Sequence, residues 1–221
     1  METGIYTPRL LYSTEWATVL FVLSFGLLAV LRTVFEKRFA EFARLIVSDK
    51  YVKVYRDGSN LLGGFNILLF VVQVLSLAFF IQIALDQFGY ASKTDWVLYI
   101  RIFTLTGVFI LSKFLIDKII ATIFGIEEFA EQFNLQKVTY RGYVSVLLLP
   151  INVILFYNNS GTDVLFYASL IALLAINLAT YLISLRNYQN FILSKLFYFI
   201  LYLCALEIAP YYFIYYWFTK H

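Results

Sequence analysis

Residues 61–85 read LLGGFNILLFVVQVLSLAFFIQIAL, and this stretch decides the fold of the chain. It has no charged residue, and it is long enough for a helix to cross about 30 Å of hydrocarbon, which takes roughly 20 apolar residues. Runs of similar character recur along the chain. Hydrophobic residues make up 62% of the 221 positions and charged residues only 14%, a balance that soluble domains of this length do not show. The sequence therefore predicts a helical membrane protein.

We predict an all-α integral membrane protein, a six-transmembrane-helix bundle that forms a single polytopic domain over residues 1–221. The predicted spans are about residues 15–34, 61–85, 96–112, 143–157, 164–185 and 196–218. The third is hard to bound because its apolar pattern continues past Lys113 to Phe124. We expect this helix to leave the membrane and continue as an amphipathic extension. The first span should stay in the mature protein, because no basic cluster or cleavage motif of a signal peptide accompanies it.

Basic residues are concentrated in the first, third and fifth connections between spans. The exceptions among the 17 Lys and Arg residues are Arg9, Lys93, Lys220 and Arg101, which lies just inside the third span. Cytoplasmic connections of membrane proteins carry an excess of Lys and Arg. We therefore predict that both termini lie outside and that these three connections are cytoplasmic.

An amphipathic segment follows the first span. Its apolar residues share one helical face: Phe35, Phe39, Phe42 and Ile46. Such a pattern indicates a helix that lies in the membrane interface, where its basic residues would contact anionic lipid headgroups or a partner protein. Residues 50–56 alternate in polarity and end at the turn sequence Asp57-Gly58, so we expect a short extended segment there.

The third connection also contains an acidic cluster, in which Glu127, Glu128 and Glu131 lie close together. Paired carboxylates suggest metal or acid-base chemistry, but such sites in helical bundles usually include Glu-x-x-His pairs. Membrane prenyl-endopeptidases need an arginine where this chain has Gln132, and they need histidines downstream. The sequence therefore excludes that family. The other interpretation is a solvated acidic face that pairs with the basic first connection in a cytoplasmic platform. The interaction candidates of this platform are Arg38, Arg44, Lys53, Arg56, Glu127, Glu128 and Glu131.

Two charged residues fall inside predicted spans, where charge is costly and often functional. Glu207 lies near the middle of the sixth span, and Arg101 lies about 9 Å into the third at about 1.5 Å per residue. The long Arg101 side chain could extend outward to the membrane surface or reach down to Glu207. Glu207 could be a proton or cation site, a buried partner of Arg101, or a protonated carboxyl group bonded to a neighbouring helix. For the intramembrane amides, including Asn152 and Asn177, we favour hydrogen bonds between helices, and a polar pathway is the alternative.

Several catalytic classes are excluded by what the sequence lacks. His221 is the one histidine. The predicted bundle therefore lacks the histidine that a Ser-His-Asp triad, a zinc site or a haem site would need. Cys204 alone provides neither a disulfide nor a cysteine metal site, and no Gly-rich phosphate loop occurs. We expect no catalytic residues, no metal, no cofactor and no nucleic-acid partner.

Four segments carry a resemblance to a known family. They are Ser48-Asp49-Lys50-Tyr51, Asn66 to Gln73, Ile126-Glu127-Glu128-Phe129 and Leu149-Pro150-Ile151-Asn152. With the Tyr- and Phe-rich helices they resemble an uncharacterised Bacteroidota inner-membrane family, domain of unknown function 4271. The resemblance implies the bundle architecture and a bacterial inner (cytoplasmic) membrane. With the Lys and Arg distribution, this compartment places both predicted outer termini in the periplasm. The resemblance implies no activity and no site.

The leading functional hypothesis is a non-enzymatic accessory or scaffold subunit of a bacterial inner-membrane protein complex, with envelope protein export as a candidate pathway. Its partners would be the lipid bilayer and other membrane proteins. One alternative is a small proton-coupled transporter or channel component centred on Glu207. A second is a membrane enzyme that acts on lipid through Glu127, Glu128 and Glu131, which metal analysis of the purified protein would test.

Replacing Glu207 by Gln separates the first two hypotheses. A proton-coupled carrier should lose transport in Glu207→Gln, because the amide cannot exchange a proton, whereas a scaffold subunit should keep both assembly and function. The measurement is recovery of the intact complex beside a proton-flux assay. Loss of flux with normal recovery of the complex would contradict the scaffold hypothesis.

Overall fold

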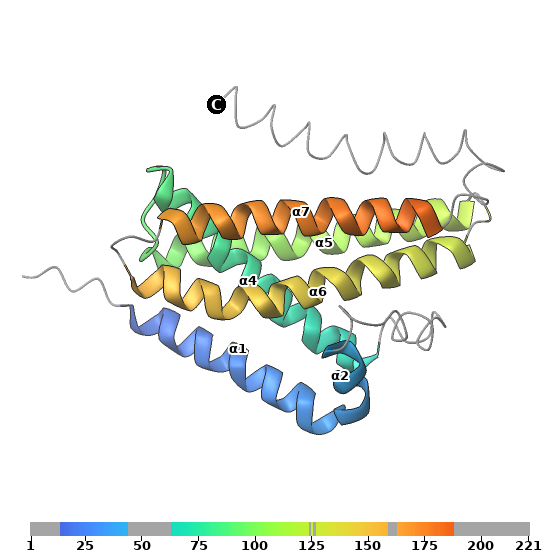
Figure 1. Ribbon diagram of the computed structural model, residues 1–221, viewed down its shortest axis with the longest axis horizontal. Helices are drawn as coiled ribbons and strands as arrows, with labels where there is room; N and C mark the ends of the chain where they lie inside the picture. The colour runs from blue at the N-terminus through green and yellow to red at the C-terminus, as the bar shows by residue number, and fades with distance from the viewer. Residues whose placement is uncertain (1–13, 44–62, 124, 126, 159–162, 188–221) are drawn as a thin grey trace, which may run out of the picture.

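The computed structural model describes residues 14–43, 63–123, 125, 127–158 and 163–187, and all regular structure in these ranges is α-helical. Figure 1 shows the six helices. They are α1 (Glu15–Val34), α2 (Glu36–Ala43), α4 (Gly64–Gln87), α5 (Trp96–Ile123), α6 (Glu127–Tyr157) and α7 (Asp163–Asn187).

The long helices contain the first five predicted spans, except for residues at the start of the second. Four are long and apolar enough to cross a membrane: α1, α4, α5 and the Lys137–Tyr157 part of α6. The helix α7 covers the predicted fifth span, and its residues Asp163–Leu178 form a shorter apolar stretch. The sixth predicted span, 196–218, and the extended segment predicted at 50–56 lie outside the described residues.

Two helices are longer than the apolar spans they contain. The helix α5 runs without interruption to Ile123, as the pattern beyond Lys113 predicted. The helix α6 begins at Glu127, far before the predicted span start at Tyr143. Its first turns are polar, so hydropathy does not mark them, but they are rich in good helix formers such as Glu, Ala and Gln. Between the two helices, Gly125 has a φ of 61°, which suits a tight turn.

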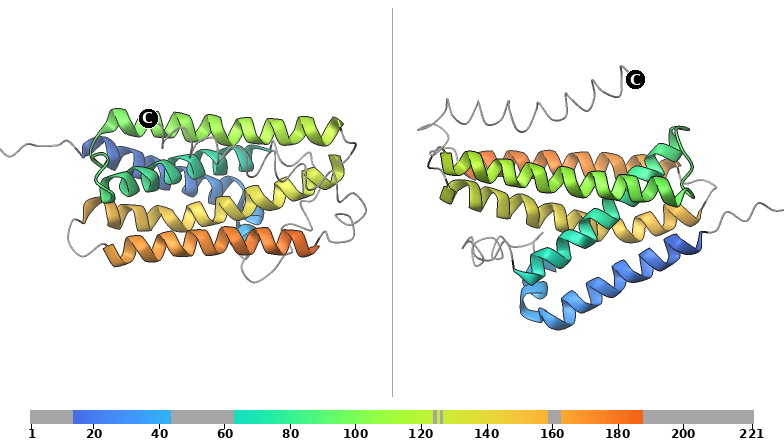
Figure 2. Two further views of the ribbon diagram at one scale, coloured as in Figure 1. Left: turned by 90° about the horizontal axis from the view of Figure 1, so that it is seen from above. Right: turned by 180° about the vertical axis from the view of Figure 1, so that it is seen from behind.

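The helix α4 is the centre around which the others pack. In its most apolar 18-residue window 61% of the residues are buried, against 22% for α1 and 22% for α5. It contacts α1, α5 and α6, and it crosses the bundle diagonally in Figures 1 and 2. Because it has neighbours on several sides, its apolar residues are spread around the helix rather than confined to one stripe.

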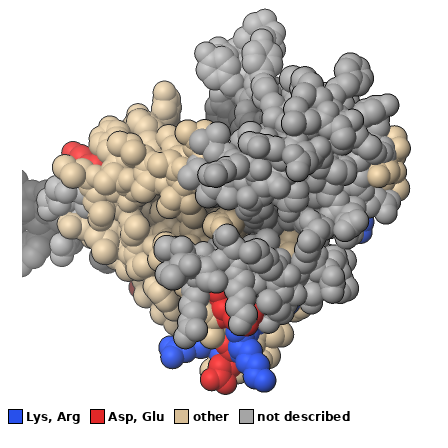
Figure 3. Space-filling view, turned by 45° about the vertical axis from the view of Figure 1, so that its right-hand side comes forward, with Lys and Arg blue, Asp and Glu red and all other residues tan. Residues whose placement is uncertain are grey.

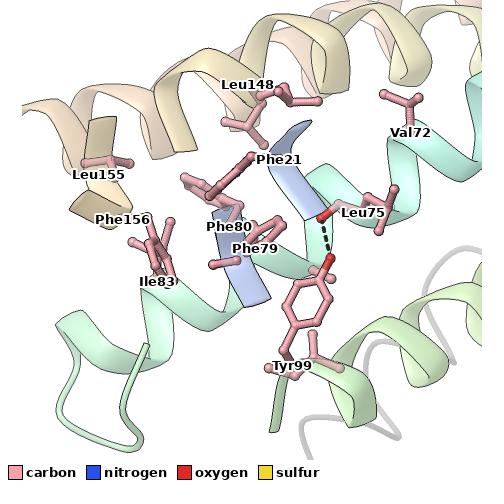
Figure 4. Close-up of a cluster of buried hydrophobic side chains, with 14 of the residues drawn as sticks. Phe21, Val72, Leu75, Phe79, Phe80, Ile83, Tyr99, Leu148, Leu155 and Phe156 are labelled. Carbon is pink, nitrogen blue, oxygen red and sulfur yellow. Dashed lines mark hydrogen bonds between the residues drawn. The ribbon is translucent and has the colours of Figure 1, made fainter. Parts of the chain in front are cut away.

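Aromatic side chains fill the core at one end of the bundle. The ring of Phe21 stacks on Phe79 with centroids 4.1 Å apart, and Phe156 and Trp16 approach the same ring at 5.9 and 6.0 Å. Figure 4 shows Phe79 between Phe21 and Tyr99, and the Tyr99 hydroxyl donates to the Leu75 carbonyl oxygen of α4 at 3.4 Å. These residues come from α1, α4, α5 and α6, so a single cluster joins four helices.

The connection between α4 and α5 is tied to the same end. The amide of Gln82 donates to the Asp95 carbonyl oxygen at 2.7 Å, and the indole of Trp16 donates to another carbonyl of this connection at 3.3 Å. The ammonium of Lys93 donates to a carbonyl of α6 at 3.4 Å. Partial burial lowers the pKa of Lys93, and the nearby Asp86 carboxylate opposes this only in part.

At the other end of the bundle, α2 packs against α4 and α6. Phe42 is 2% exposed, and its ring lies 5.8 Å from Phe65 of α4 and 5.6 Å from Tyr143 of α6. The Arg38 guanidinium lies 4.9 Å from the centre of the Phe65 ring. The helix predicted after the first span is therefore present, with part of its apolar face covered by α4 and α6. Figure 3 shows charged side chains of both signs at this edge of the molecule.

Gly142 lets α4 and α6 approach closely. A Cβ atom at this position would lie 2.7 Å from Leu69 Cδ2 and 3.0 Å from Leu69 Cγ. Leu69 is itself 2% exposed and packed on its other sides. Any larger residue would therefore push α4 away from α6 or force Leu69 into a strained rotamer.

We predict that Gly142→Ala lowers the free energy of unfolding by about 1–3 kcal/mol, because overpacking a tight core strains it. The measurement is the thermal midpoint Tm of the protein purified in detergent. The matched control is Gly26→Ala on α1, where an added Cβ meets nothing within 4 Å, and there Tm should stay level or rise. Equal Tm values for both variants would contradict the close approach.

Candidate functional site

A line of hydrogen bonds joins α4 to α6 inside the bundle. Asn152 is fully buried, and its Nδ2 donates to the Ser76 carbonyl oxygen at 2.8 Å and to the Ser76 hydroxyl at 3.3 Å. The Ser76 hydroxyl in turn donates to the Ser145 carbonyl oxygen at 2.9 Å. Ser145 and Asn152 are about two helical turns apart, on one face of α6. We call this set of three residues the polar seam.

One polar atom of the seam has no described hydrogen-bond partner. Asn152 Oδ1 is buried and accepts no hydrogen bond in the part of the chain that the structure describes. A buried acceptor without a donor is expensive in a low-dielectric interior. The amide is therefore held firmly through its nitrogen, while its oxygen keeps unused hydrogen-bonding capacity.

The other intramembrane candidates lie away from the seam. Arg101 is exposed on the outer side of α5, and its guanidinium forms no hydrogen bond or ion pair with the described residues. Asn177 is exposed on α7, and its amide donates to the Leu173 carbonyl oxygen of its own helix at 2.8 Å. Glu207, the predicted partner of Arg101, lies outside the described residues.

The platform candidates are only partly described. Arg38 is half-buried and covers Phe65, while Arg44, Lys53 and Arg56 lie outside the described residues. Glu127, Glu128 and Glu131 belong to the first turns of α6, where the backbone is described and the side chains are not. Among the described residues, no group of three or more His, Cys, Asp or Glu side chains could hold a metal ion.

A cavity of about 220 Å³ lies between α4, α5, α6 and α7. Its polar lining residues are Gln73, Thr106, Lys113, Arg141, Ser145 and Asn177. Apolar side chains such as Leu77, Phe109 and Leu173 complete the wall, and no described acidic residue lines it. The cavity borders the polar seam, because Ser145 belongs to both.

Two charged residues line this cavity, Lys113 and Arg141, and two more lie one helical turn from them. Lys113 and Asp117 lie one turn apart on α5, and Lys137 and Arg141 lie one turn apart on α6, which α5 contacts. Lys113, Asp117 and Lys137 are 8%, 4% and 7% exposed. The cluster holds three cations and one anion, so its net charge is positive with every group ionised.

Sequence reasoning did not identify Ser76, Ser145 or the cavity. The spacing of Gly142, Ser145 and Asn152 at three and seven residues places small and polar groups on one face of α6, and that signal could have revealed the seam. The cavity has no such signal, because four different helices supply its residues.

The described fold defines a class: an α-helical bundle in which four helices have the length and composition of membrane spans. A family model described as Domain of unknown function (DUF4271) matches residues 17–218, and the chain belongs to this family. This confirms the resemblance to domain of unknown function 4271 that the sequence segments carry. No curated protein and no solved structure matches the chain.

We predict that Ser76→Ala destabilises the protein by about 0.5–1.5 kcal/mol, because it removes the hydroxyl that links Asn152 to Ser145. The measurement is again Tm in detergent. Ser24→Ala on α1 is the control, since Ser24 is as deeply buried but bonds only the Leu20 carbonyl of its own helix. If both serine variants lose the same stability, the seam has no special role in joining α4 to α6.

Proposed function

We propose that this chain is a non-enzymatic accessory or scaffold subunit of a protein complex in the inner membrane of a Bacteroidota cell. In this proposal six helices span the bilayer and both termini lie in the periplasm. The four membrane-length helices and the uneven distribution of Lys and Arg support this placement. The end of the bundle with the aromatic cluster would then be periplasmic, and α2 would lie on the cytoplasmic side.

One observation carries the subunit proposal: Arg101 on the outer face of α5. Val97, Leu105 and Val108 are 43%, 65% and 58% exposed, and Arg101 shares their face at helical spacing. Lipid tails suit the three apolar residues but offer no partner for a guanidinium. A neighbouring helix that carries a carboxylate or a free carbonyl oxygen would satisfy both parts of this face.

The contrast between the inside and the outside of the bundle favours the same function. The aromatic cluster and the polar seam fix α4 against three helices, which makes a rigid centre. The helices α1 and α5 each leave most of their apolar surface outside this centre. A rigid core with long apolar outer faces is well suited to hold other membrane helices in place.

The cytoplasmic end would add a charged docking surface. Glu36 and Lys37 of α2 are exposed beside Arg32 at the end of α1. Because Phe42 anchors α2 to the bundle, these charges keep a fixed position relative to the spans. In the proposal, this surface and the acidic start of α6 form the platform that a cytoplasmic partner contacts.

The test is recovery of the complex from native membranes. We expect tagged wild-type protein, extracted in mild detergent, to copurify with a stoichiometric set of membrane proteins that mass spectrometry identifies. Arg101→Gln should reduce their recovery at least about tenfold, which corresponds to losing one ion pair of about 1.4 kcal/mol. Arg101→Lys should restore part of it.

Lys118→Gln is the control, because it removes an exposed cation of the same helix that lies 17 residues from Arg101 and outside the proposed platform. Isolation of the wild-type chain alone or as a homodimer would overturn the proposal. Glu207→Gln should leave the recovery of the complex unchanged, because in this proposal the partner of Arg101 belongs to another chain.

A further inference from the structure

The cavity between α4, α5, α6 and α7 contains polar groups that the described protein leaves unused. Gln73 is 3% exposed and lines the cavity, yet its side-chain amide forms no hydrogen bond with the described residues. Thr106, at 8% exposed, likewise has a hydroxyl without a described partner. The large majority of buried side-chain polar atoms in proteins have a hydrogen-bond partner, either a protein group or an ordered water. Two such groups facing one cavity indicate a polar ligand inside it.

The charge of the lining specifies the sign of that ligand. Arg141 and Lys113 reach the cavity from two different helices, and no described acidic residue lines it. The Arg141 guanidinium forms no hydrogen bond or ion pair among the described residues. A guanidinium presents a planar fork of donors that matches phosphate and carboxylate oxygens. Asp117 lies one turn from Lys113, but Lys137 lies one turn from Arg141, so the surroundings stay positive.

The depth of the cavity specifies where the ligand comes from. Lys113 lies about 25 Å along α5 from Trp96, and Arg141 about 24 Å along α6 from Tyr157, at about 1.5 Å per residue. Trp96 and Tyr157 are at the aromatic end, so both cations sit close to the opposite surface of a hydrocarbon layer about 30 Å thick. In the orientation of the proposed function, this is the level of the cytoplasmic headgroups.

We infer that the cavity binds the phosphate of an anionic phospholipid from the cytoplasmic leaflet. Arg141 and Lys113 neutralise the phosphate, while Gln73 and Thr106 supply hydrogen bonds to its oxygens or to the glycerol. Leu77, Phe109 and Leu173 contact the beginning of an acyl chain. Basic pockets between membrane helices on the cytoplasmic side recognise lipid headgroups by this chemistry. The lipid source rests on the orientation in the proposed function, but the binding itself needs no partner subunit.

The experiment measures Tm of the purified full chain in nanodiscs of phosphatidylcholine, with and without phosphatidylglycerol. Wild-type protein should gain about 5 °C from phosphatidylglycerol, since a ligand that binds only the folded state stabilises it. Arg141→Gln should abolish this gain. Lys118→Gln should keep it, because Lys118 is an exposed lysine of α5 that does not line the cavity.

Gln73→Leu separates a role of Gln73 in ligand binding from a purely structural role. Removing a buried polar group without a partner should raise Tm in phosphatidylcholine alone, whereas the gain from phosphatidylglycerol should shrink. This variant also covers the case in which Arg141→Gln fails to fold. A gain that is equal in wild type, Gln73→Leu and Lys118→Gln would overturn the site.

Inorganic phosphate added to phosphatidylcholine nanodiscs distinguishes the two sources of the same chemistry. No effect of inorganic phosphate beside a clear effect of phosphatidylglycerol supports a lipid headgroup. An equal effect of inorganic phosphate would overturn the lipid and identify a free anion instead. Because these measurements use the isolated chain, they can succeed or fail independently of any copurified partner.

Discussion

The contact between α4 and α6 is the constraint on which the other features depend. In a low-dielectric interior a hydrogen bond between helices stabilises their association, and close approach of the backbones adds dispersion contacts. Gly142 permits that approach, and Ser76, Ser145 and Asn152 use it. With α4 fixed against α6, α1 and α5 have defined surfaces to pack against, and α7 packs on α6.

The bundle has two ends of different chemistry. At one end, aromatic rings from four helices meet around Phe79, and hydrogen bonds from Trp16 and Gln82 hold the connection between α4 and α5. At the other end, α2 covers Phe65, and the cations Lys113 and Arg141 line the cavity. The aromatic end provides rigidity through packing. The charged end provides groups that can recognise something outside the protein.

Arg101 and Arg141 share one feature, a guanidinium that needs a partner from outside the described residues. Each guanidinium lacks a described partner, and each lies within a helix long enough to span a membrane. Arg101 faces outward from α5, where a helix could pair with it, whereas Arg141 faces a cavity too small for a helix. The two positions therefore suit ligands of different size, which is why the proposed partner and the proposed lipid are separate and compatible.

The sequence by itself determined the class of structure, because hydropathy and helix length are local properties. It located α1, α4, α5 and the apolar part of α6, and it indicated the helix after the first span. It did not locate the early start of α6, since polar helix formers carry no hydropathy signal. The roles of Glu207, Arg44, Lys53, Arg56 and the acidic start of α6 stay predictions. Only the tertiary structure decided that Asn152 bonds Ser76 and that Gln73, Lys113 and Arg141 share one cavity, because such contacts depend on how helices far apart in sequence are rotated and paired.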